Sequence, residues 1–121
     1  MAGTVTTTEE THGTVRKITF AWTSSAGGAA DATTTYAYSG EVIRLVTVPG
    51  TAGNQPTNLY DVVVNDVDGN DVLMGAGANR SNAATEQVLA SSLGCVANDK
   101  LTLGVTNAGD TKQGTVYLYV R

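Results

Sequence analysis

The sequence is short of charged residues and has almost no cysteine, histidine or proline. Its 121 residues include seven Lys or Arg, eleven Asp or Glu, two Pro, one Cys and one His. A single cysteine excludes an intrachain disulfide, and one Cys with one His excludes a zinc site built from several such ligands. The basic residues are scattered apart from Arg16 and Lys17, whereas nucleic-acid binding needs clustered positive charge. We therefore expect no cofactor and no nucleic-acid partner.

Long apolar runs are missing as well. A membrane-spanning helix needs about 20 consecutive apolar residues, and hydrophobic residues make up 41% of this chain in short, interrupted stretches. The first ten residues also lack the basic and apolar regions of a secretory signal. We therefore expect no membrane partner, and we expect the protein to be made and used from the cytoplasm.

Threonine, alanine, valine and glycine supply most of what is present. Thr and Val favour strands through their branched Cβ atoms, and the 14 glycines suit tight turns. The length is enough for one hydrophobic core and too small for two. Composition alone therefore predicts a single all-β domain.

Alternating side chains indicate where the strands lie. Residues 14–24 place Ile18, Phe20 and Trp22 on one face, and we expect Trp22 to be core. The last strand alternates in the same way. Further strands are expected at residues 34–39 and 41–48, broken at Gly40, and at 59–66, 72–74 and 101–106, while 86–93 fits a strand or a helical turn equally. About seven or eight short strands at this spacing predict a jelly-roll-like antiparallel β-sandwich.

Residues 1–13 are Thr-rich and acidic, and they lack the apolar periodicity of a core strand. We interpret them as an extended N-terminal arm or an edge strand, followed by the β-sandwich domain at residues 14–121. Such an arm can add a strand to a neighbour's sheet through main-chain hydrogen bonds. Val5, Thr7 and His12 are the contact residues that we expect within it.

Few residues are candidates for chemistry. His12 is the single histidine, and because catalytic histidines need a rigid setting and an orienting partner, we expect no enzyme. The run Asp66–Asp71 has oxygen ligands at the first, third and fifth positions of a calcium loop, but the sixth position is Asp71 and the twelfth is Gly77. A hairpin tip is favoured there, with a looser calcium site left open and no metal ligand assigned. Cys95 is expected to be a small buried thiol.

Two tyrosine pairs are the remaining lead. Tyr36 with Tyr38, and Tyr117 with Tyr119, are spaced so that both rings of a pair share one strand face. These faces are either buried inside the sandwich or exposed as a protein interface, where tyrosine is enriched. A third alternative is a host-surface carbohydrate-binding module, in which these tyrosines stack on sugar rings. The predicted interface therefore comprises Val5, Thr7, His12, Tyr36, Tyr38, Tyr117 and Tyr119.

Three runs cover most of the chain: ITFAWTSSAGGAADATTTYAYSGEVIRLVTVPGTAG, NLYDVVVNDVDGNDVLMGAGANRSNAATEQVLASSLG and NDKLTLGVTNAGDTKQGTVYLYVR. Together they resemble a family of small virion structural proteins of tailed bacteriophages and related prophages. The resemblance carries no catalytic motif and transfers no functional residue. It implies a capsid decoration (cement) protein, a homo-oligomer with a trimer favoured, that is assembled in the host cytoplasm and binds the major capsid protein on the capsid surface. A tail, neck or baseplate component is the main competitor.

Overall fold

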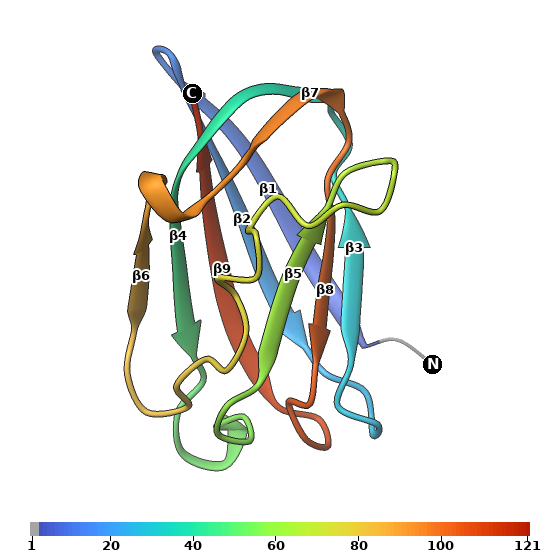
Figure 1. Ribbon diagram of the computed structural model, residues 1–121. Helices are drawn as coiled ribbons and strands as arrows, with labels where there is room; N and C mark the ends of the chain where they lie inside the picture. Colours follow the sequence, from blue (N-terminus) through green and yellow to red (C-terminus); the bar gives the residue numbers. More distant parts are fainter. Residues whose placement is uncertain (1–2) are drawn as a thin grey trace.

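The protein is an antiparallel β-sandwich, as the sequence predicts. The computed structural model describes residues 3–121, in which nine strands and two short 3-10 segments form two stacked sheets (Figure 1). Every strand pair is antiparallel. One or two more strands are present than the sequence indicated.

The two sheets differ in size. The larger has the order β1-β2-β9-β4-β6, with β7 paired to the first part of β4, and the smaller has the order β3-β8-β5. The strands are β1 (Thr4–His12), β2 (Val15–Thr23), β3 (Ala30–Thr33), β4 (Tyr38–Pro49), β5 (Asp61–Asn65), β6 (Glu86–Leu89), β7 (Cys95–Asp99), β8 (Thr102–Thr106) and β9 (Gln113–Val120), and the 3-10 segments are η1 (Ala52–Asn54) and η2 (Ala90–Ser92).

The core lies between the sheets. Ile18, Phe20 and Trp22 of β2 are at most 1% exposed, because alternate residues of a strand point to the same face. The Trp22 ring packs against that of Tyr60, with centroids 5.5 Å apart. The prediction that Trp22 belongs to the core is confirmed.

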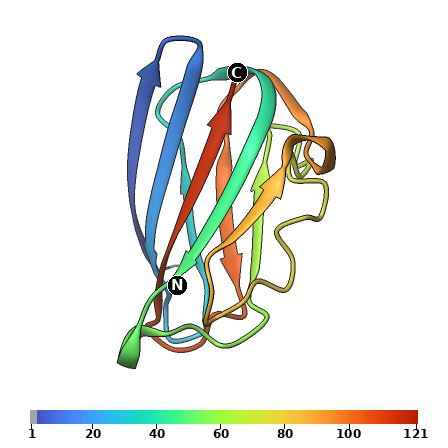
Figure 2. The ribbon, with the colours of Figure 1, turned by 90° about the vertical axis from the view of Figure 1, so that its left-hand side faces the viewer.

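The segment predicted as an arm or an edge strand forms β1. It pairs with β2 in an unbroken register from Thr4 opposite Thr23 to His12 opposite Val15, and Figure 2 shows it as the outermost strand of its sheet. The expected boundary between residues 13 and 14 falls in the β1–β2 turn. Residues 1–2 of the predicted arm lie outside the described residues.

Four local predictions were wrong. The strand expected at residues 34–39 begins only at Tyr38, after a bend. Gly40 does not break a strand but lies inside β4, at a bulge where the register shifts and φ is 134°. An added Cβ there would lie 2.7 Å from the carbonyl oxygen of Arg121, so glycine carries β4 past the end of β9 without interruption. Strands β3 and β7 were missed, because β3 has only four residues, with alanine as its apolar residue, and β7 does not alternate apolar and polar residues. Residues 72–74 form a turn instead of a strand.

The segment of residues 71–80 covers the open side of β5. The backbone N–H of Val62 donates to the carbonyl oxygen of Gly77 at 2.8 Å, and the N–H of Arg80 donates to that of Tyr60 at 2.7 Å. The segment therefore supplies an irregular fourth element beside the smaller sheet, and the backbone of β5 has hydrogen-bond partners on both sides.

Candidate interaction surface

Tyr117 and Tyr119 lie on the outer face of the larger sheet. Their neighbours Val116, Leu118 and Val120 are fully buried between the sheets, whereas both tyrosines are half-buried. The alternation of β9 therefore turns the two rings away from the core. Of the two placements open from the sequence, the structure excludes burial between the sheets.

Basic side chains from the neighbouring strands cover these rings. The Nζ of Lys17 on β2 is 5.1 Å from the centroid of Tyr117, and the Cζ of Arg44 on β4 is 5.1 Å from that of Tyr119. Arg44 also donates from Nη2 to Oε1 of Gln87 at 2.6 Å. A cation over an aromatic ring stabilises an exposed pair by about 0.5–1 kcal/mol. The two rings are therefore held in defined orientations.

These contacts follow from the register of the sheet. Tyr119 lies directly opposite Lys17 on one side and Arg44 on the other, and Tyr117 lies opposite Thr19 and Val46. We name this set the outer-sheet patch: Lys17, Thr19, Arg44, Val46, Tyr117 and Tyr119. The patch places two tyrosines and Arg44, residue types that are enriched at protein interfaces, on one sheet face, with the 7% exposed Val46 between them.

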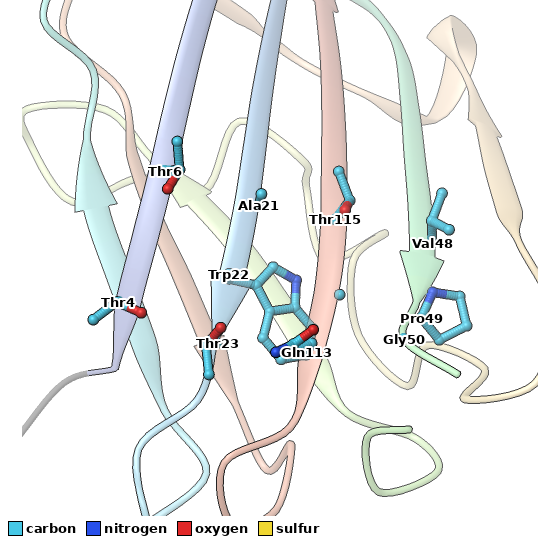
Figure 3. Close-up of a pocket in the computed structure, with 11 residues that line it drawn as sticks. Thr4, Thr6, Ala21, Trp22, Thr23, Val48, Pro49, Gly50, Gln113 and Thr115 are labelled. Carbon is cyan, nitrogen blue, oxygen red and sulfur yellow. The ribbon is translucent and has the colours of Figure 1, made fainter. Parts of the chain in front are cut away.

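A shallow hollow of about 310 Å³ extends the patch toward the ends of β1, β2 and β9 (Figure 3). Small and polar side chains line it, among them Thr6, Ala21, Thr23, Val48, Gln113 and Thr115. Gly114 is required here, because a Cβ at this position would overlap the ring of Trp22. The hollow therefore has a wall of backbone and small side chains with the buried indole beside it.

The contact residues predicted in the N-terminal segment have separate positions. Val5 and Thr7 lie opposite the buried Trp22 and Phe20 on the inward face of β1, and Val5 packs against the core. His12 lies at the end of β1 with its side chain 65% exposed, and its Nε2 is 3.7 Å from Oε1 of Glu10.

Tyr36 and Tyr38 do not share a strand face, which corrects the prediction for this pair. Tyr36 lies in a bend and is 63% exposed, whereas Tyr38 begins β4 and is 6% exposed. The hydroxyl of Tyr38 donates to Oε1 of Glu9 at 2.7 Å. Burial, together with this contact, raises the pKa of Tyr38 well above its usual range.

Glu9 fastens the inward side of β1 to the loop before β4. Besides Tyr38, its carboxylate accepts the backbone N–H groups of Thr35 at 2.9 Å and Tyr36 at 3.1 Å. Burial opposes ionisation of this carboxyl, but the hydrogen bonds from Thr35, Tyr38 and Tyr36 outweigh that effect and lower its pKa. β1 is thus anchored by a side chain as well as by its pairing with β2.

The acidic run at Asp66–Asp71 divides into two parts. Oxygens of Asp66 and Asp68 come within 4.8 Å of one another and of a carboxylate oxygen of Asp99. Asp66 also accepts the N–H of Asp68 at 3.0 Å and closes the turn. Both carboxylate oxygens of Asp71 are occupied by backbone N–H groups, those of Val64, Leu73 and Gly75. Asp71 therefore serves as an anchor for the segment that covers β5.

The expectation that Cys95 is a buried thiol was wrong. Cys95 is exposed at the start of β7, and the next residue, Val96, points inward and is 5% exposed. Alternation along β7 allows only one of the two neighbours to face the core.

No known protein-family model matches the chain, and no curated protein matches it either. Among residues 3–121 no helix is long and apolar enough to cross a membrane. The candidate interaction surface consists of the outer-sheet patch and the hollow beside it, and β1 adds a backbone edge that pairs with no other strand among residues 3–121.

Proposed function

We propose that this protein is a non-enzymatic structural protein of a tailed-bacteriophage virion. It binds the outside of the capsid, mainly through the outer-sheet patch, and stabilises the head by bridging subunits of the major capsid protein. Two observations support this function: the resemblance of the sequence to virion structural proteins, and the pair of tyrosine rings that Lys17 and Arg44 hold on the outer sheet face.

The patch has the properties of a protein-binding surface. Tyrosine and arginine are enriched at the energetic centres of interfaces, and ordering them before binding lowers the entropy lost on association. The adjacent hollow offers a recess of about 310 Å³ for a protruding side chain. Many copies on one shell would strengthen even a modest contact, because neighbouring subunits engage together.

The geometry gives less support to the other functions considered. His12 is 65% exposed at a hairpin end and lies beside Glu10 at 3.7 Å, which is a poor setting for a general base. Sugar stacking needs an open ring face, but the faces of Tyr117 and Tyr119 carry cations and Tyr38 is buried. Of these four tyrosines, Tyr36 alone is well exposed.

Gold-labelled antibody against the protein, applied to virions of the phage that encodes it, tests the location. Labels spread over the head surface are expected. Labels confined to the tail, neck or baseplate would overturn the capsid assignment in favour of that competing location.

A binding assay tests the surface. Heads that lack the protein are mixed with purified protein and sedimented, and the double variant Tyr117→Ala/Tyr119→Ala is compared with wild type. We expect the variant to bind at least about tenfold more weakly, as loss of interface hot spots does. Tyr36→Ala is the matched control and should bind normally. Equal binding by the double variant and wild type would contradict the role of the patch.

A further inference from the structure

β1 presents a long unpaired backbone edge. It runs for nine residues without proline, lysine or a bulge, features that often protect an edge strand, and its charged side chains are the inward-facing Glu9 and the outward-facing Glu10. Within the described residues, β1 pairs with β2 alone, and no further hydrogen bond joins the β1 backbone to another segment. The strand is about 30 Å long, and its outer backbone forms no strand pair, although β1 lies beside β3 and the N–H of Gly3, just before β1, donates to the carbonyl oxygen of Ala29.

The other sheet edges are short or covered. β3 and β6 have four residues each, and β5 is covered by the 71–80 segment. β1 is also anchored, because Glu9 accepts two hydrogen bonds from the loop before β4 and one from Tyr38, the first residue of β4. The free edge of β1 is therefore preorganised for a further strand.

We propose that two copies of this chain associate through β1. The two strands pair antiparallel about a two-fold axis at Thr8, so that the larger sheets of both copies form one continuous sheet. This inference concerns the protein alone and stands independently of the proposed virion function.

Side-chain parity and charge select that axis. Directly opposite residues must face the same side of a sheet, so a two-fold axis through the strand must lie at a residue of β1. An axis at Thr8 pairs all nine residues, and it sets Glu10 opposite Thr6 and Glu9 opposite Thr7 of the second copy. A hydroxyl then faces each carboxylate and can donate to it. An axis at Glu9 would instead place the Glu9 carboxylates of the two copies directly opposite each other, and like charges in that position are destabilising.

Symmetry favours two copies over three for this contact. A ring of three would need a different long edge on each copy to receive the β1 of its neighbour. The described residues offer for that role the short strands β3 and β6, of four residues each, and β7, of five. Pairing β1 with itself uses the same nine residues on both copies and closes after two.

A charge-reversal experiment tests the pairing and its axis together. The wild-type protein is followed by sedimentation equilibrium over a series that reaches high micromolar concentration, because a strand contact is smaller than a standard interface. We expect a monomer–dimer equilibrium. Thr8→Lys and Thr8→Glu should each weaken it about tenfold or more, since like charges would be directly opposite. An equimolar mixture of the two variants should restore association.

Thr106→Lys is the matched control, because Thr106 is also an exposed strand threonine but lies on β8. It should associate as wild type does, and circular dichroism should show all variants folded. A wild-type monomer throughout the series would overturn the proposal. So would unweakened association of Thr8→Lys, or a mixture that associates no better than the separate variants.

Cross-linking gives a second readout. Opposite residues of an antiparallel pair have Cα atoms about 4.5–5.5 Å apart, within the range that a disulfide spans. Thr8→Cys in a Cys95→Ser background should therefore oxidise to a covalent dimer, whereas Thr106→Cys in the same background should not. Equal dimer yields from the two proteins would contradict an axis at Thr8.

Discussion

The two edge strands β5 and β1 differ in whether another segment of the chain covers their outer backbone. β5 is closed by an irregular segment that donates to and accepts from its backbone, as at Val62–Gly77 and Tyr60–Arg80. β1 is nearly twice as long, with nine residues against five, yet its outer backbone has no such cover within residues 3–121. The difference shows that this fold can close one edge from its own chain, whereas the outer backbone of β1 pairs with no other strand among residues 3–121.

The sequences of the two sides reflect this contrast. The segment that covers β5 bends sharply, with φ of 54° at Met74, 82° at Gly75 and 56° at Asn79, a conformation that costs most residues energy. β1 is a run of threonines, valine and acidic residues that suits a regular strand. The cover therefore depends on a few anchoring groups, and β1 depends on its pairing and on Glu9.

The largest effect is expected from Asp71→Ala. This change removes the acceptor for three backbone N–H groups, two of which are partly buried. Loss of hydrogen bonds to a charged group should lower the free energy of unfolding by about 2–4 kcal/mol, measured by urea denaturation. Asp68→Ala is the control, since Asp68 is exposed, and should stay within about 0.5 kcal/mol. A loss in Asp71→Ala no larger than in the control would show that the cover is not anchored there.

Gly77→Ala should act on the same cover through sterics. An added Cβ would overlap the carbonyl oxygen of Val62 and lie 2.9 Å from Cδ1 of Leu73, so the segment must move away from β5. Overpacking of this kind costs about 1–3 kcal/mol. Amide hydrogen exchange at Val62 should accelerate as well. Gly53→Ala, with no atom within 4 Å of its added Cβ, is the control, and exchange at Val62 that matches this control would contradict the close approach.

Glu9→Gln should have a smaller effect, confined to the open side. The lowered pKa of Glu9 means that the folded state favours the ionised carboxylate, so its contribution is present above the unfolded-state pKa of about 4.3 and is lost as pH falls through the folded-state pKa. At neutral pH the substitution should cost about 1 kcal/mol after allowance for solvent screening. Denaturation midpoints measured down to acid pH should converge for the two proteins. A constant difference at every pH would show that the charge of Glu9 has no part.

Cys95→Ser should have almost no effect. Cys95 is exposed on β7, away from both long edges, and surface substitutions usually change the free energy of unfolding by less than about 0.5 kcal/mol. Thermal unfolding measures this directly. Burial of a small side chain contributes about 1 kcal/mol. A larger loss in the free energy of unfolding would therefore mean that the thiol packs against neighbouring side chains.

The core was predictable because it depends on local alternation. The sequence placed Ile18, Phe20 and Trp22 on one strand face without any knowledge of the neighbouring strands. The outer-sheet patch was only half predictable. Tyr117 and Tyr119 could be paired from their spacing, but Lys17 and Arg44 reach them through cross-strand register, which a single sequence does not contain.

Two other errors have the same origin. Tyr36 and Tyr38 share a face only if both belong to one strand, and the strand begins at Tyr38. We expected Cys95 to be buried because cysteine is commonly buried. In β7, however, it is the neighbouring Val96 that points inward. In each case the tertiary position of a strand decided the outcome, and the local sequence did not.

Trp22 gives the molecule an optical probe at a useful place. It is the single tryptophan of the chain, and its indole is buried, lines the hollow and packs under Gly114. Its ring nitrogen has no hydrogen-bond partner among the described residues, so its fluorescence should be that of an indole in apolar surroundings. A partner that settles on the outer face would perturb this emission, and binding can therefore be followed on the unlabelled protein.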